Sequence, residues 1–317
     1  MRVALPRCAI AASLGLLGLG MASCDLSGGT DETRGSVASQ RPGHGMDFRA
    51  YLYDQGAEIR TFDLEQSRYG ANHSGRSVMI FVTEPFDRVL QVKADNPDSP
   101  SADPALKLNF TRKFNTGVYP YSTMVSVFQP LAREDPARAW KVTTSVQEWC
   151  GMVFQQINRR EDGLHLRLFS YFMSEGDQDR LLEDAWLEDA FWTRLRLDPA
   201  SLPTGAVRVV PGSLYCRLAH RDPRAYAAQT TLEDIDREGA AGQALSRYTV
   251  RYEDLDRSLS ITFARSFPHE ITQWTESWGG GTTRGTCTHH RFLPYWQLNG
   301  PGHRALRREL GLPVDMQ

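Results

Sequence analysis

The chain has 317 residues, of which 41% are hydrophobic and 23% charged, as in ordinary globular proteins. It is long enough for one large or two modest domains with a real apolar core. Lys plus Arg number 36 against 38 Asp plus Glu, so no strong positive field exists, and nucleic-acid binding is disfavoured.

The N-terminus has the layout of a secretory signal peptide. Two arginines precede an apolar run over residues 9–21, which is too short to cross a bilayer comfortably as a helix. Residues 21–24 read Met-Ala-Ser-Cys and resemble the bacterial lipobox, in which the cysteine becomes the lipidated first residue. The sequence therefore predicts a signal peptide over residues 1–23 and lipidation of Cys24. An ordinary signal peptide cleaved nearby is the alternative.

Lipidation would determine where the protein resides. Acyl chains such as palmitate on Cys24 would anchor it, because each buried CH₂ contributes about 0.8 kcal/mol. Residues 24–47 are rich in Gly, Ser and Thr and predict a flexible tether, with one β-rich domain over residues 48–317. We expect a periplasmic, membrane-anchored protein of the bacterial cell envelope. Whether the inner or the outer membrane holds it stays open.

From residue 57 onward the pattern indicates strands. Residues 57–64 alternate between polar and apolar side chains, as in a half-buried strand, and residues 77–83 are apolar throughout, as in a strand covered on both faces. Further strands are expected over residues 106–114, 122–128, 206–210, 214–218, 247–252, 259–263, 271–278 and 284–292.

The stretch from 106 to 154 is dense in glycine, proline and aromatic residues. Residues 140–158 form a long predicted strand in which Gly151 indicates a bulge or a sharp bend. Gly117, Pro120 and Gly151 are read as corners that curve the sheet. Residues 164–171 alternate and pair back as a hairpin.

One segment has helical spacing. Apolar residues recur from residue 182 to 195, acidic residues come early and arginines late, and Pro199 ends the run. We expect a helix of roughly three to four turns, with Trp186, Phe191 and Leu195 buried against the sheet. Residues 219–246 are expected to form a loop with a short helix, and residues 305–310 a short C-terminal helix.

This succession predicts the fold class. At least nine short strands with little βαβ alternation favour a mainly β protein. We expect a large antiparallel curved sheet or partly open barrel with one or two packed helices.

Two cysteine motifs suggest chemistry. Glu148 and Cys150 flank Trp149, and on one strand they would share a face, which places a carboxylate beside a thiol. Cysteine catalysis needs a lowered thiol pKa, and no histidine lies nearby in sequence, so we favour a structural Cys150. Cys287 and His289 would also share a strand face, but they supply only two of the ligands that zinc needs.

Other site types are weaker still. Acidic residues alternate over residues 175–179 without the spacing of a calcium loop, so we read a solvated loop. Hydrolase, P-loop and zinc-protease motifs are absent from the sequence, and we predict no cofactor and no metal. Cys150, Cys216 and Cys287 allow at most one disulfide, whose pairing stays open.

Aromatic residues are spread over many elements, among them Tyr119, Tyr121, Trp149, Trp192 and Trp274. A curved sheet lined with them would enclose an apolar ligand, and the alternative is a well-filled core. Tyr119, Tyr121, Glu148, Trp149 and Cys150 are our candidate functional residues, none of them assigned to catalysis.

The motifs Asn-Thr-Gly-Val-Tyr-Pro-Tyr-Ser at residues 115–122 and Ser-Val-Gln-Glu-Trp-Cys-Gly at residues 145–151, with Glu-Gly-Asp at 175–177, carry a resemblance. They are similar to a family of uncharacterised bacterial envelope proteins, over about residues 57–278. More distantly, a strand-rich domain after a lipobox resembles the half-barrel lipoprotein carriers, which is an analogy of fold.

These observations favour a lipid-anchored periplasmic protein that binds a hydrophobic ligand or an envelope partner. Two alternatives remain. One is an envelope enzyme that uses Glu148 and Cys150 or Cys287 and His289, and the other is a purely structural lipoprotein.

Overall fold

The computed structural model describes residues 49–131, 138–238 and 242–314. The strands in these residues are β1 (Ala57–Arg68), β2 (Ala71–Asp87), β3 (Val92–Lys93), β4 (Ala102–Thr116), β5 (Tyr119–Pro130), β6 (Lys141–Glu148), β7 (Gly151–Arg160), β8 (Gly163–Ser170), β9 (Gln178–Leu182), β10 (Trp186–Leu187), β11 (Gly205–Val210), β12 (Tyr226–Glu238), β13 (Ala244–Tyr252), β14 (Arg257–Ala264), β15 (Ile271–Trp278) and β16 (Gly281–Leu293). The helices are α2 (Glu188–Leu197) and α3 (Ser213–Ala219), with the short helical segments η1 (Ala50–Asp54), η2 (Pro199–Ser201), η4 (Tyr295–Gln297) and η5 (Pro301–Arg307).

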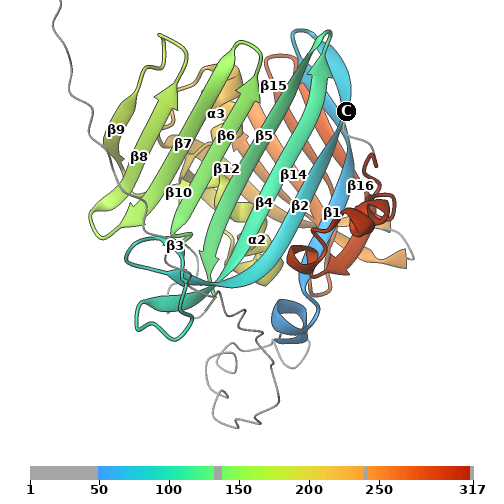
Figure 1. The fold of residues 1–317 in the computed structure, drawn as a ribbon. Coiled ribbons are helices and arrows are strands. Elements are labelled where there is room, and N and C mark those ends of the chain that lie inside the picture. Colours follow the sequence, from blue (N-terminus) through green and yellow to red (C-terminus); the bar gives the residue numbers. More distant parts are fainter. Residues whose placement is uncertain (1–48, 132–137, 239–241, 315–317) are drawn as a thin grey trace, which may run out of the picture.

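All of these strands belong to one sheet. Its order is β10-β11-β12-β13-β14-β15-β16-β1-β2-β4-β5-β6-β7-β8-β9, with β3 paired to β2, and every pairing except the parallel β10–β11 is antiparallel. Figure 1 shows the sheet curling so that β4 to β9 form a front wall and β12, β14 and β15 lie behind it. The predicted fold class, a large curved antiparallel sheet with packed helices, is confirmed.

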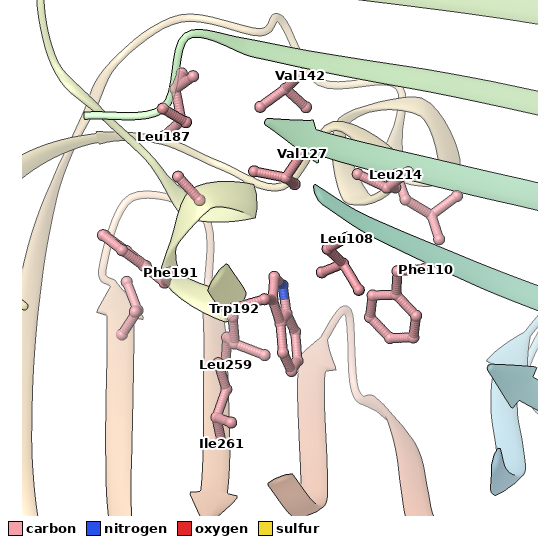
Figure 2. Close-up of a cluster of buried hydrophobic side chains, with 14 of the residues drawn as sticks. Leu108, Phe110, Val127, Val142, Leu187, Phe191, Trp192, Leu214, Leu259 and Ile261 are labelled. Carbon is pink, nitrogen blue, oxygen red and sulfur yellow. The ribbon is translucent and has the colours of Figure 1, made fainter. Parts of the chain in front are cut away.

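Helix α2 fills the space between the two walls. All ten of its residues are buried, so no face of this helix meets solvent. In Figure 2, Trp192 lies between Leu108 and Phe110 of the front wall and Leu259 of the back wall. Phe191 points the other way, and its ring contacts Tyr248 of β13 edge to face. Apolar burial on this scale is the main source of stability for the fold.

The helix differs from its prediction at its N-terminal end. Leu182 ends β9, and Trp186 lies in β10, half-buried against Phe191, so the helix starts only at Glu188. Phe191 and Leu195 are buried as expected. Trp186 and Leu187 form the short strand β10, and not the start of the helix, because they pair with β11 in the sheet.

Helix α2 carries charged side chains that are buried in the core. Glu188 accepts hydrogen bonds from Arg257, with Nη2 to Oε1 at 2.5 Å, and from the Tyr252 hydroxyl at 2.7 Å. At the other end of the helix, Arg196 is fully buried and pairs with Glu58 of β1. Glu188 and Arg196 therefore each have an opposite charge as partner, which offsets the cost of burying them.

The Glu58 site gathers the largest set of partners. Burial alone would raise the pKa of Glu58, but Arg196, a hydrogen bond from His290, Arg60 and the Tyr51 hydroxyl together lower it. Glu58 is thus held ionised inside the sheet and ties α2 to β1 and β16.

Helix α3 closes the seam between the two ends of the sheet. Its Ser213 hydroxyl lies 2.6 Å from Thr144 of β6, and both its backbone N–H and its hydroxyl donate to Asp189 of α2. Beside it, Arg208 of β11 donates to Glu183 at 2.8 Å, after the end of β9. The sheet edges are therefore joined by side chains rather than by a strand ladder.

Two segments near α3 were predicted wrongly. Residues 214–218 are helical, not a strand, because an acid from α2 caps the turn that begins at Ser213. Residues 226–238, expected within a loop, form β12. The strand was missed because its inward-facing positions include Ala228 and Thr230, which are small or polar and hide the alternation of apolar and polar residues.

Asp189 predicts a pH dependence of stability. Burial raises its pKa to about 6 against the two hydrogen bonds from Ser213. A raised pKa stabilises the fold fully below about pH 3.8, and this contribution is lost as the pH rises through about 6, by up to about 3 kcal/mol. We expect Asp189→Asn to gain stability relative to the native protein between pH 4 and 7.5 in urea unfolding. A constant difference between the two over this range would contradict the assignment.

The described residues contain no helix that is long and apolar enough to cross a membrane. The predicted signal peptide, Cys24 and the tether lie outside the described residues.

Candidate functional site

Four turns lie along the upper edge of the sheet in Figure 1. They join β1 to β2, β4 to β5, β6 to β7 and β8 to β9, and each presents a large exposed apolar side chain. We call this set the upper rim and define it as Tyr69, Val118, Trp149, Tyr171 and Met173. Met173 is fully exposed and Val118 is 84% exposed, where a folded protein normally has polar residues at its turns.

The Tyr69, Tyr119 and Tyr121 hydroxyls meet just below the rim. Tyr119 donates to the Tyr69 oxygen at 3.0 Å, and the Tyr69 and Tyr121 oxygens are 2.9 Å apart. Tyr119 also stacks on Trp149, with ring centroids 6.2 Å apart. The structure therefore brings together three of the aromatic candidates, from β5 and the β6–β7 turn, and adds Tyr69.

Arg68 completes this cluster from the end of β1. Its guanidinium carbon lies 4.5 Å from the Tyr69 ring centroid, and its Nη1 donates to the Leu218 carbonyl of α3 at 2.6 Å. Partial burial would raise the pKa of Tyr69, but hydrogen bonds with Tyr119 and Tyr121 and the charge of Arg68 lower it. The Tyr69 hydroxyl thus links the two other tyrosines, while the Tyr69 ring packs on Arg68.

Glu148 is a buried partner of α3. Its side chain is 2% exposed, and Oε1 lies 3.4 Å from Nη2 of Arg217, whose side chain is 4% exposed. The Arg217 guanidinium in turn lies 4.1 Å from the Phe172 ring. Glu148 thus helps to seat α3 against β6, which is a positioning role.

Cys150 lies in the turn after β6. Trp149 and Cys150 form a two-residue connection between β6 and β7, so the predicted single strand over residues 140–158 is wrong. The backbone N–H of Cys150 donates to Glu148 Oε2 at 2.7 Å, and interaction with Glu148 raises the pKa of its exposed thiol. An activated cysteine needs the opposite shift, so this geometry does not favour nucleophilic catalysis.

Gly151 opens β7 directly after the sharp β6–β7 turn, so the chain bends here, as one of the two predicted alternatives had it, and does not bulge. A Cβ on this residue would lie 2.5 Å from Cγ of Tyr171, so only glycine lets that ring pack here. Gly117, by contrast, has φ +59° in the β4–β5 turn, as expected for a corner, whereas Pro120 pairs with Asn115 inside the strand ladder. The glycines of both motifs therefore shape the upper rim.

Cys287 and His289 do not share a face. In the pairing of β1 with β16, the neighbours Thr61 and Phe62 lie opposite His289 and Cys287, so Thr288 is an extra residue in β16. This irregularity turns the Cys287 and His289 side chains to opposite faces of the sheet. Burial raises the pKa of the Cys287 thiol, and Arg60 lies 3.5 Å from its sulfur. Within the described residues, no group of His, Cys, Asp and Glu side chains has the arrangement of a metal site.

The acidic residues of the β8–β9 turn have separate partners. Glu175 accepts from Ser170 at 2.5 Å and lies 2.7 Å from His220 Nδ1, whereas Asp179 pairs with Arg167. This supports the interpretation as a loop of the scaffold.

Many of the other aromatic residues fill the core. Trp192 contacts Phe110 and Trp274 edge to face, and Trp140 stacks on Phe86. The interior that would enclose an apolar ligand is thus occupied by α2 and its neighbours. Exposed apolar side chains lie at the upper rim, and a second group, Val89, Leu90 and Val92, lies after β2 and in β3.

Sequence reasoning missed Arg68, Tyr69, Arg217 and His220. A signal existed for Tyr69, because Tyr-Gly followed by a polar run indicates a hairpin turn, and a large aromatic residue at the tip of a turn is uncommon. Nothing local distinguishes the two arginines.

No family model and no curated protein matches the chain. Among solved structures it is similar to a beta-barrel-like protein of a domain of unknown function, DUF1849, from Brucella abortus. The TM-score is 0.48 at 9% sequence identity, over 75% of this chain and 98% of that chain. Membership of an envelope lipoprotein family stays a prediction from the motifs.

Proposed function

We propose that this protein is a lipid-anchored binding protein of the bacterial cell envelope that holds the apolar body of a hydrophobic ligand on its upper rim. One observation carries the proposal. Five large apolar side chains from four separate turns are exposed together, and two of the turns are built around glycines that the strand geometry or the Tyr171 ring requires.

The energetics favour a binding role for this surface. Exposing Trp149 and its neighbours to water forgoes burial worth about 1.5–3 kcal/mol for each large side chain. Trp149 is also held in place by its stack on Tyr119, so little conformational freedom would be lost when an apolar chain lies against it. A pre-positioned aromatic platform of this kind suits an apolar ligand.

The anchor is the second part of the proposal and depends on the lipobox-like residues 21–24. Acyl chains on Cys24 would keep the binding domain close to the lipid supply of the envelope. Membrane fractionation tests this part, because a Cys24→Ser form should leave the membrane pellet and lose palmitate labelling. Retention of both would reject the anchor without affecting the rim.

The rim itself is tested by ligand affinity. Isothermal titration calorimetry with dodecyl maltoside, kept below its critical micelle concentration, measures this affinity. We expect Trp149→Ala to weaken binding about tenfold, because truncating a central aromatic anchor costs more than about 1 kcal/mol of binding free energy. Trp296→Ala is the matched control, because Trp296 is 47% exposed but lies in η4, far from the rim.

Two outcomes would contradict the proposal. Equal affinity of the native protein and Trp149→Ala would place the ligand elsewhere, and no binding at all would favour an envelope protein partner or a structural role.

A further inference from the structure

A polar hollow of about 460 Å³ lies next to the upper rim, between the β1–β2 and β15–β16 turns. Its volume is within the range of small-molecule sites. The side chains that line it are Ser67, Arg68, Tyr69, Asn72, Trp278 and Thr282. Gly70, Ala71 and residues 279–281 supply the rest of the wall.

Glycines keep side chains out of this wall. Gly279 and Gly280 have φ values of +56° and +76°, which L-residues with a side chain rarely adopt. A Cβ on Gly281 would lie 2.1 Å from the Ser67 Oγ, so the two turns approach as closely as backbone permits. The wall therefore presents main-chain groups to whatever occupies the hollow.

The lining of the hollow carries positive charge and no negative charge. Arg68 is the charged side chain of its lining, which contains no carboxylate. Within residues 49–131, 138–238 and 242–314, no acidic side chain forms an ion pair with Arg68, whose Nη1 donates to the neutral Leu218 carbonyl. By contrast, Arg112, Arg196 and Arg257 each pair with a glutamate. Arg68 is thus a cation without a counter-charge from the described protein.

We propose that this hollow binds an anionic group, a phosphate or a carboxylate, of the ligand whose apolar body lies on the upper rim; this inference rests on the proposed function. Arg68 would supply charge-assisted hydrogen bonds, with Asn72 and the Thr282 hydroxyl as further donors. Tyr69 joins the two parts, since it lines the hollow and its hydroxyl lies 3.0 Å from that of Tyr119, on which Trp149 stacks. The ligand class is therefore an anionic amphiphile.

The test compares two amphiphiles with the same chain. Dodecyl phosphate and dodecyl maltoside, both below their critical micelle concentrations, are titrated calorimetrically into the native protein. We expect the phosphate to bind about tenfold more tightly, the value of one hydrogen bond to a charged group. Arg68→Gln should abolish that preference, so that the two amphiphiles bind this variant with equal affinity. Inorganic phosphate is the third probe and separates a lipid headgroup from the free anion.

Two further variants make the result specific. Asn72→Asp places a negative charge in the lining without changing its shape, and it should lower the preference even if Arg68→Gln folds poorly. Arg76→Gln removes the same charge from a half-exposed residue that pairs with Asp63, away from the hollow, and it should retain the preference.

The outcomes separate the two proposals. If both amphiphiles bind equally, or the preference survives both Arg68→Gln and Asn72→Asp, the anionic site is wrong while the rim proposal stands. If neither amphiphile binds but inorganic phosphate binds in an Arg68-dependent way, the anionic site stands and the rim proposal fails. Failure of all three probes to bind overturns both.

Discussion

Replacing Trp192 with alanine is expected to lower the free energy of unfolding by about 3–5 kcal/mol, the usual cost of removing a large aromatic side chain from a core. Trp192 is 3% exposed on α2, between the two walls of the sheet, where it contacts Phe110 of β4 and Trp274 of β15 edge to face. Its removal would leave a cavity that neither wall is able to fill, because both are fixed by strand ladders.

Urea or guanidinium unfolding measures this change. Trp296→Ala is again the control, and as a surface substitution it should shift stability by no more than about 0.5 kcal/mol. A loss below about 1 kcal/mol for Trp192→Ala would mean that α2 is not the centre of the core, and that the interior has room for a ligand.

The second large effect concerns a buried ion pair. Arg257→Met is expected to cost about 3–5 kcal/mol, because it leaves the Glu188 carboxylate buried without its cation. The Arg257 side chain is 0% exposed and that of Glu188 3%. Burial would lower the pKa of Arg257, but the adjacent Glu188 raises it, so the guanidinium stays charged in the core.

The double variant Glu188→Gln with Arg257→Met tests the cause. Removing both charges should recover most of the loss, since a neutral pair carries no uncompensated charge. If the double variant is as unstable as Arg257→Met alone, the cost comes from lost packing around Tyr215 and Tyr252 instead.

The hairpins were predictable because their signals are local. Residues 247–252 and 259–263 alternate around a polar turn and pair in β13 and β14 as expected. The direction of curvature and the place of α2 follow from contacts between distant residues. Glu188 and Asp189 were considered only as charges suited to a helix N-terminus, yet they are buried, because Arg257 and Ser213 arrive from elsewhere in the chain.

Helix α3 also could not be predicted from local sequence. Six of its seven residues are buried, so it has no polar face, and the amphipathic pattern that reveals a surface helix is absent. Its capping acid, Asp189, lies 24 residues earlier. The sequence Leu-Tyr-Cys-Arg-Leu at 214–218 is therefore compatible with a buried strand when read alone.

The arrangement of the candidate residues could be predicted in part from the sequence. Tyr119, Tyr121 and Trp149 come together, with Glu148 and Cys150 on either side of Trp149 in the chain, because the β4–β5 and β6–β7 turns belong to adjacent hairpins at one end of the sheet. The partners of these residues come from distant parts of the chain: Arg68 and Tyr69 from the end of β1 and Arg217 from α3. Pairing of β1 with β2 and packing of α3 bring them to the same end of the sheet. Local sequence carries no information on that closure.

The central claim is that the ligand lies on the upper rim and not inside the sheet. Quenching of tryptophan fluorescence by a bromine-labelled dodecyl chain tests it most directly, since bromine quenches only at close range. The account predicts quenching in the native protein that is largely lost in Trp149→Phe, while the buried Trp192 and Trp274 keep their emission. Undiminished quenching in Trp149→Phe would place the chain in the interior and contradict the account.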